Sequence, residues 1–256
     1  DIMVQSVGIQ RNNGMEGFDW AIHKGDPNGA DSDLGIRPFD TRQALILRDR
    51  FDSVEGLSGG RNDDILTGAS KLIIGEAFTD QLTQAGVDRI DGLRDTLNVA
   101  TGLPTDVVFE SDINGGGEII LGGAGSDRIR GNLGNDILDG DAWLNVRISV
   151  MSNKDGTGTE LFTVDSLNEI QARLRSGEIN PGQLKAVREI LNSDGTKVSE
   201  TGGTTNSATD HDIAIFSDIY ANYTIEGADP FNNVIGADTT GDGFITITHN
   251  VPGGGG

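Results

Sequence analysis

The chain has 256 residues, 38 of them glycine and only 5% aromatic, and it carries a formal net charge of −21 at pH 7. A surface this acidic repels phosphate backbones and anionic lipid, so we expect no nucleic-acid partner and no membrane insertion. Cysteine is absent, which excludes disulfides, iron–sulfur clusters, cysteine-bound zinc and thiol nucleophiles.

Residues 1–49 come before any repeat, and we predict that this N-terminal segment packs against the repeats that follow. It contains His23 beside Lys24 and Asp26, the one group of side chains in the sequence that merits a test for catalysis. A solvated loop histidine is the simpler interpretation of His23.

The first repeat-like block spans residues 50–67. Its second half, residues 59–67, follows the nonapeptide pattern GGxGxDxUx, in which U is a large apolar residue, with Asn62 in place of one glycine. The first half carries Glu55 at the acidic position and Leu57 at the apolar position. The candidate metal-site residues of this block are Gly60, Asn62 and Asp64.

Residues 68–112 separate this block from the main repeats. Within them Ile90, Leu93 and Leu97 recur at helical spacing. We predict a helical insertion that covers the side or the end of the repeats.

Three contiguous nonapeptides fill residues 113–139. The middle one, residues 122–130, fits the pattern at every position, and acidic residues recur every nine residues along the three. The candidate metal-site residues here and in the partial turn that follows are Asn114, Gly116, Glu118, Gly123, Gly125, Asp127, Asn132, Gly134, Asp136 and Asp141.

Each part of the nonapeptide has a physical role. Glycine permits positive φ and asparagine tolerates it next best, so the first six residues should form a turn and the last three a short strand. Two repeats make one coil. Glu118 and Asp136 should therefore stack on one edge, and Asp127 should lie on the other, beside Asp64 or the partial turn 140–141.

Stacked carboxylates on strands about 4.8 Å apart repel one another unless a cation lies between them. A hard cation that prefers six to eight oxygen ligands suits such turns, and no histidine or cysteine is placed for zinc or copper. The sequence therefore predicts several Ca²⁺ ions as cofactors. The alternative is a set of ordinary glycine- and aspartate-rich turns between strands.

Residues 143–205 are predicted to form a strand and a helical hairpin. Residues 142–150 alternate as a strand does, and Ser166 and Glu169 match a capping box at the start of a helix. That helix should end near Gly177. Asn180 and Pro181 are predicted to begin a second helix that runs through Leu191.

Residues 206–256 contain two alternating runs, 212–225 and 244–249, which predict a C-terminal β-hairpin or small sheet. Residues 238–245 between them match the front half of an EF-hand loop. His249 stands where that loop needs a bidentate glutamate, so a plain turn is favoured. The predicted fold class is thus mainly β: a parallel β-roll of nonapeptides over residues 50–142, with a helical insertion, a helical hairpin and the C-terminal strands.

The nonapeptides resemble RTX, or haemolysin-type, calcium-binding repeats. Other stretches resemble the RTX-bearing region of large secreted bacterial proteins that also carry an animal-type haem peroxidase domain, some of them implicated in extracellular manganese oxidation. The stretches are 19–27, 139–147, 160–165, 177–184 and 212–217, and the resemblance covers most of residues 17–225.

The resemblance implies export by a type I secretion apparatus and a secreted, extracellular or cell-surface location. No peroxidase catalytic domain is recognisable in the sequence, so haem would belong to a domain that is not present here.

Three functions are therefore considered. The first is a non-catalytic calcium-binding RTX module that stays unfolded at low cytosolic calcium and folds outside the cell. The second is part of an enzyme, either an extracellular haem peroxidase whose catalytic domain lies outside this chain or a calcium-dependent polysaccharide-acting protein. The third is an adhesion module whose acidic face contacts the extracellular matrix or neighbouring domains of the same polypeptide.

Overall fold

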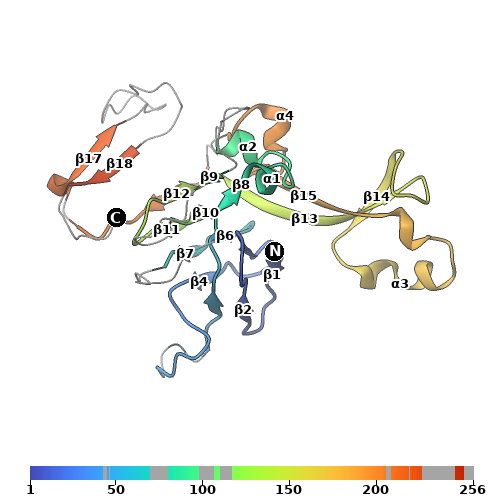
Figure 1. Cartoon of the computed structure of the whole chain (residues 1–256), viewed down its shortest axis with the longest axis horizontal. Helices are drawn as coiled ribbons and strands as arrows, with labels where there is room; N and C mark the ends of the chain where they lie inside the picture. The colour runs from blue at the N-terminus through green and yellow to red at the C-terminus, as the bar shows by residue number, and fades with distance from the viewer. Residues whose placement is uncertain are drawn as a thin grey trace.

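The computed structural model describes residues 1–42, 45, 47–69, 80–97, 107–109, 117–205, 209–218, 220–226 and 246–250. Strands predominate over helices, and parallel pairing dominates the centre of the molecule, in agreement with the predicted mainly-β class. Figure 1 shows a central stack of short strands, an arm that projects to one side and a terminal hairpin.

One parallel sheet has the strand order β1-β3-β6-β10-β12. Its strands are β1 (Ile2–Val4), β3 (Trp20–Ile22), β6 (Gly56–Ser58), β10 (Ile119–Leu121) and β12 (Ile137–Asp139). Ile119 pairs with Ile137, two nonapeptides further along the chain, which confirms the predicted register.

A second sheet has the order β16-β11-β7-β4, and its pairs are parallel as well. Its strands are β4 (Asp31–Asp33), β7 (Ile65–Thr67), β11 (Arg128–Arg130) and β16 (Ile213–Ala214). The repeat strands alternate between the two sheets along the chain. The segment 1–49, predicted to pack against the repeats, supplies β1, β3 and β4 to these same sheets, while β2 (Arg11–Asn13) pairs with β5 (Arg50–Asp52).

The core lies on both faces of the first sheet. The middle residues of the repeat strands point into the space between the two sheets, where Leu57, Ile120, Leu66 and Ile129 form one buried cluster. The flanking residues point the other way, so Ile119 and Leu121 belong to a separate cluster with the insertion and the base of the arm. Burial on both faces explains why residues 119–121 are all apolar.

Among its described residues the insertion contains two short helices, whereas one helix was predicted. Its elements are β8 (Leu82–Thr83), α1 (Gln84–Val87), α2 (Leu93–Thr96) and β9 (Val107–Phe109). Gly92, in the left-handed region at φ 83°, precedes α2 and separates the two helices. Ile90, Leu93 and Leu97 are buried, so the predicted apolar stripe does face the core.

The arm consists of β13 (Ala142–Met151), β14 (Glu160–Val164), α3 (Leu167–Arg175), a 3-10 turn (Pro181–Gln183) and β15 (Leu184–Asn192). The capping box of Ser166 and Glu169 is present at the start of α3. The predicted second helix is wrong, because residues 184–192 form a strand antiparallel to β13 along nine residue pairs. Such pairing satisfies the backbone of the long strand β13, and this tertiary gain overrides a helical spacing of apolar residues.

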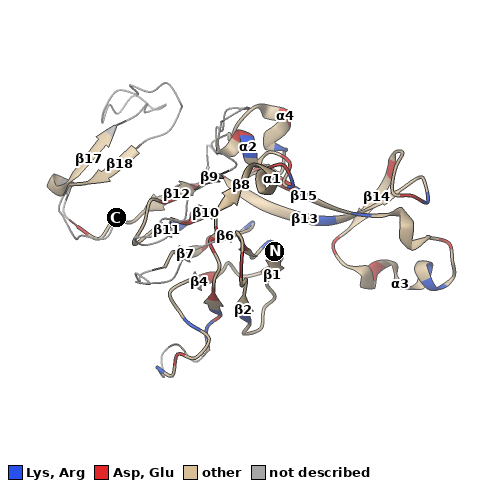
Figure 2. Cartoon of the chain, in the orientation of Figure 1, with Lys and Arg blue, Asp and Glu red and all other residues tan. Residues whose placement is uncertain are grey.

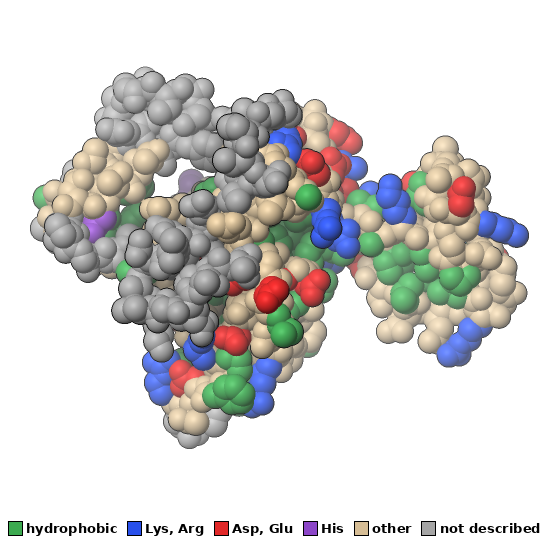
Figure 3. Space-filling view, in the orientation of Figure 1, with side chains coloured by type: hydrophobic (Ala, Val, Ile, Leu, Met, Phe, Trp, Pro, Cys, Tyr) green, Lys and Arg blue, Asp and Glu red, His purple; other side chains and the backbone are tan. Residues whose placement is uncertain are grey.

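The arm has a small core of its own around Val150, Ile170 and Ile179. Figure 3 shows it as a separate lobe with hydrophobic side chains on the visible face, and its exposed large ones are Leu161 and Leu167.

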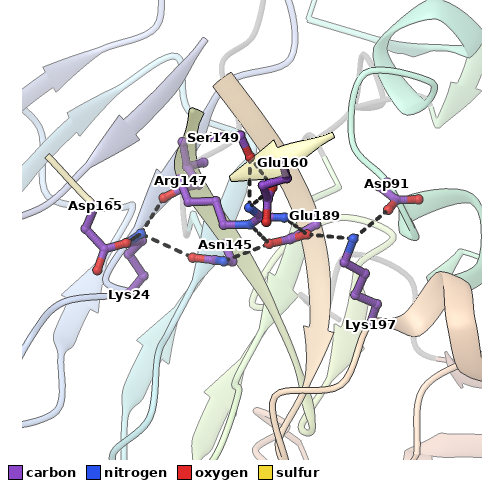
Figure 4. A network of polar contacts seen from close by, with 10 residues as sticks. Lys24, Asp91, Asn145, Arg147, Ser149, Glu160, Asp165, Glu189 and Lys197 are labelled. Atoms are coloured by element: carbon purple, nitrogen blue, oxygen red, sulfur yellow. Dashed lines mark hydrogen bonds and ion pairs between the residues drawn. The ribbon is translucent and has the colours of Figure 1, made fainter. Parts of the chain in front are cut away.

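A network of charged groups joins the arm to the central strands (Figure 4). Glu189 is 2% exposed and accepts hydrogen bonds from Arg147 Nε at 2.6 Å and Asn145 Nδ2 at 3.0 Å. Lys24, from the turn after β3, donates to Asp165 at 2.7 Å and to Asn145 at 3.2 Å. The Glu189 contacts lie within the arm, and Lys24 ties the arm to the central strands through the partly buried contact with Asn145 and the exposed contact with Asp165.

The chain then passes through α4 (Val198–Thr201) to β16, a 3-10 turn (Tyr220–Asn222), β17 (Tyr223–Glu226) and β18 (Thr246–His249). β17 and β18 pair antiparallel, as predicted for the C-terminal hairpin. The EF-hand-like stretch 238–245 lies outside the described residues. None of the helices described here is long and apolar enough to cross a membrane.

Candidate metal centre

Three aspartates close successive turns on one edge of the central strands. Asp64, Asp127 and Asp212 directly precede β7, β11 and β16, and we call them the first ladder. Each carboxylate accepts a hydrogen bond from the backbone N–H at the equivalent position of the neighbouring strand. The pairs are Ala30 to Asp64 at 2.5 Å, Asp64 to Asp127 at 2.7 Å and Asp127 to Asp212 at 2.9 Å.

A second ladder runs along the opposite edge. It consists of Asp19, Glu55, Glu118 and Asp136, which directly precede β3, β6, β10 and β12. The N–H of Asp19 donates to Glu55 at 3.0 Å, and that of Glu118 donates to Asp136 at 2.9 Å. The predicted stacking of Glu118 with Asp136, and of Asp127 with Asp64, is therefore present in the structure, and Figure 2 shows acidic segments recurring through the central strands.

A glycine opens each contiguous turn five residues before the acid that closes it. A Cβ on Gly59, Gly122 or Gly131 would lie under 3.0 Å from the carboxylate of Asp64, Asp127 or Asp136, respectively. At Gly59 and Gly122 the same Cβ would also meet the carbonyl oxygen of the next turn. The absence of a side chain thus leaves a space in which a carboxylate and a carbonyl oxygen meet, and these are ligands that Ca²⁺ prefers.

Positive φ occurs at the second and fourth positions of two turns, as predicted. The residues are Gly123 (110°), Gly125 (121°), Asn132 (75°) and Gly134 (124°). The turn 59–64 differs, because Gly60 and Asn62 do not adopt positive φ. Gly60 N–H donates to Asp64 at 2.8 Å, and the Asn62 amide donates to the carbonyl of Asp26 at 2.8 Å.

Three buried carboxylate oxygens in the ladders have no hydrogen-bond partner. They are Oδ2 of Asp127, Oε2 of Glu118 and Oδ2 of Asp19, and the three residues are 0%, 4% and 1% exposed. Buried polar atoms are almost always paired, so the unpaired oxygens of Asp127 and Glu118 lack a donor or a cation, whereas the other oxygen of Asp19 is ion-paired with the N-terminal ammonium.

The same burial perturbs the acidities. Burial raises the pKa of Asp127 to about 8, and the charges of Asp64 and Asp212 add to the effect. Burial, followed by the charge of Asp136, raises the pKa of Glu118 to about 11. Burial also raises the pKa of Glu55 to about 8 and that of Asp64 to about 6. Without a cation, Asp127, Glu55 and Glu118 hold protons at neutral pH, whereas Asp64 is mostly ionised.

No family model, no curated protein and no solved structure matches the chain. No three histidine, aspartate or glutamate side chains of the described residues converge on one point as a metal-ligand group. A cation here would take backbone carbonyl oxygens as part of its ligand set.

Two of the predicted site residues, Asn114 and Gly116, lie outside the described residues. Asp141 lies just after β12, where its N–H donates to Asp139 at 3.0 Å as the chain leaves for the arm. On the first ladder, Asp212 fills the acidic position next to Asp127, and Gly140 of the partial turn lies beside the turn 122–127, where its carbonyl accepts from Gly123 N–H at 2.8 Å.

Sequence reasoning missed a further turn of the same design, residues 14–19. A Cβ on Gly14 would lie within 3.0 Å of Asp19, and positive φ recurs at the second and fourth positions, Met15 (71°) and Gly17 (100°). The available signal was the spacing, because Gly14, Gly17 and Asp19 occupy the first, fourth and sixth positions of the pattern.

The expectation of a solvated histidine at position 23 is wrong. His23 is 4% exposed, neither ring nitrogen has a hydrogen-bond partner, and burial lowers its pKa. It follows β3 directly, where Gly59 follows β6 and Gly122 follows β10. The turn that His23 opens is closed by Ala30. His23 and Ala30 thus stand where the other turns have glycine and aspartate, and the first ladder ends at this turn.

Proposed function

We propose that this chain is a calcium-binding module of the RTX type, in which the central strands act as a parallel β-roll and Ca²⁺ ions bind at the turns on its two edges. The observation that carries the proposal is the set of buried carboxylate oxygens without partners on Asp19, Glu118 and Asp127. A divalent cation supplies the missing partner and removes the repulsion within each ladder.

Calcium suits these turns better than other common metals. The donors are carboxylate and carbonyl oxygens, whereas zinc and copper favour histidine and cysteine. Magnesium demands a near-ideal octahedron and keeps several waters, while calcium accepts irregular sets of six to eight oxygens. The net charge of −21 favours any cation but does not distinguish between them.

The proposed setting is a secreted bacterial protein, exported by a type I apparatus, whose module folds on meeting extracellular calcium and has no catalytic role of its own. Extracellular modules bind calcium with Kd values of about 10⁻⁴–10⁻³ M. Because an ion bound only to the folded state stabilises it by RT ln(1 + [L]/Kd), several weak sites together can contribute a few kcal/mol.

Far-ultraviolet circular dichroism tests the proposal. The chain is stripped with EDTA and titrated with Ca²⁺, and a parallel sample receives Mg²⁺ over the same range. We expect a gain of β signal with calcium and little change with magnesium. A full β signal in EDTA, with no heat of calcium binding by calorimetry, would refute the proposal.

Incubation with haem belongs in the same experiment, because the proteins that this chain resembles include haem peroxidases. We expect no Soret band from haem binding to this chain. A stable band would favour the enzymatic alternative.

A further inference from the structure

The turn after β12 is divided between two distant parts of the chain. Gly140 follows β12 and Asp212 precedes β16, and residues 141–211, which include the arm, lie between them in the chain. A Cβ on Gly140 would nevertheless lie under 3.0 Å from Asp212 Oδ2. The same holds for a Cβ on Gly59 and Asp64, and for a Cβ on Gly122 and Asp127. The two residues thus stand in the same relation as the opening glycine and closing aspartate of a contiguous turn.

The strand register agrees with this equivalence. Arg128 pairs with Ile213 on one side of β11 and with Ile65 on the other, so Asp212 and Asp64 occupy matching positions beside Asp127. Both halves of the divided turn also contact the turn 122–127. Gly123 N–H donates to the carbonyl of Gly140 at 2.8 Å, and Gly125 N–H donates to Asp210 at 3.3 Å.

An independent feature points to a ligand at this place. Asp127 is fully buried, its Oδ1 accepts from Asp64 N–H, and its Oδ2 has no partner. A Cβ on Gly122 would lie within 3.0 Å of this Oδ2 and 2.6 Å from the carbonyl oxygen of Gly140. An unpaired buried oxygen therefore faces the first half of the divided turn.

We propose that Gly140 and Asp212 form a split turn that binds a divalent cation together with Asp127. The inference rests on the proposed function, since it assigns to this turn the calcium chemistry of the contiguous ones. Its consequence is structural: one ion ties the point where the chain leaves for the arm to the point where it returns.

The strand that the ion would secure is short. β16 is held to β11 by hydrogen bonds from Ile213 N–H to Asp127 O and from Ile215 N–H to Ile129 O, both at 2.8 Å. Without a cation, the carboxylates of Asp127 and Asp212 disfavour each other's charge, and such an edge strand opens readily. With the cation bound, the same two residues hold β16 in place.

Amide hydrogen exchange followed by NMR tests this directly. In the wild-type chain, calcium should slow exchange at Ile213 and Ile215 by at least about tenfold relative to EDTA. The Asp212→Asn variant removes the charge but keeps an oxygen that can accept the Asp127 N–H, so hydrogen bonding alone is preserved. We expect it to lose the calcium-dependent protection of Ile213 and Ile215 while keeping that of Ile65. Asp155→Asn, at an exposed position of the arm, is the matched control and should behave as wild type.

The outcomes separate the two proposals. If calcium changes neither the dichroism nor any amide of the wild-type chain, the proposed function fails and the split turn fails with it. If calcium protects Ile65 and Arg128 but leaves Ile213 and Ile215 unchanged, the proposed function survives and the split turn is refuted. An Asp212→Asn variant that retains wild-type protection at Ile213 refutes it as well.

Discussion

Replacement of Asp127 by asparagine should stabilise the metal-free chain and reduce the stabilisation that calcium provides. The side chain is fully buried, and one of its oxygens has no partner. Asparagine has nearly the same shape and can still accept the hydrogen bond from Asp64 N–H. The substitution therefore removes the ionisable group and leaves most of the packing intact.

The magnitude follows from the acidity of Asp127. Its pKa in the folded, metal-free chain is about 8, against about 3.9 in an unfolded chain. A raised pKa contributes stability that is fully present below pH about 4 and is lost as the pH rises toward 8. At about 1.4 kcal/mol per pH unit, the metal-free wild type loses at most roughly 4 kcal/mol by pH 7, and the variant avoids this loss.

With calcium the difference shrinks, and it reverses where Asp127 is a ligand of two ions. Binding at about 100 times Kd stabilises the wild type by about 2.7 kcal/mol per site, which the variant forgoes wherever Asp127 is a ligand. Urea unfolding followed by dichroism, in EDTA and in calcium at pH 5 and pH 7, measures both effects, with Asp155→Asn as control. An Asp127→Asn variant equally destabilised in EDTA and in calcium at pH 7 would refute this account of the ladder.

Two further substitutions test the turns and the base of the arm. Gly122→Ala places a Cβ against the carboxylate of Asp127 and the carbonyl of Gly140 and should lower the free energy of unfolding by about 1–3 kcal/mol. The control is Gly25→Ala, whose Cβ would meet nothing within 4 Å and should change the free energy of unfolding little. Equal effects of the two substitutions in urea unfolding would contradict the steric argument. Glu189→Gln leaves Arg147 without its buried carboxylate and should cost roughly 3 kcal/mol in thermal unfolding, whereas Glu200→Gln, at an exposed site, should not. Burial acts to raise the pKa of Glu189, but hydrogen bonds from Arg147 and Lys197 outweigh it, so the pKa is lowered. The contribution of Glu189 to stability is therefore present above pH about 4.3 and is lost as the pH falls. The stability of Glu189→Gln should thus depend less on acidic pH than that of the wild type.

The sequence by itself determined the features that depend on short spacing. The nine-residue step fixed which residues close turns and which point inward, so the register of β10 with β12 and the stacking of Glu118 with Asp136 could be predicted. The capping box at Ser166 is equally local. In each case a few neighbouring residues determine the backbone conformation, because glycine or a capping side chain is required at that place.

Only the tertiary structure decided the features that depend on distant partners. Residues 184–192 carry a helical spacing, yet they form β15 because β13 offers nine pairing positions. Asp212 joins the first ladder although the arm separates it from Gly140 in the chain. His23 is buried because the turns of the following coils stack on the turn that contains it. Pairing between segments far apart in the chain leaves no periodic trace in either segment, so spacing alone could not have revealed it.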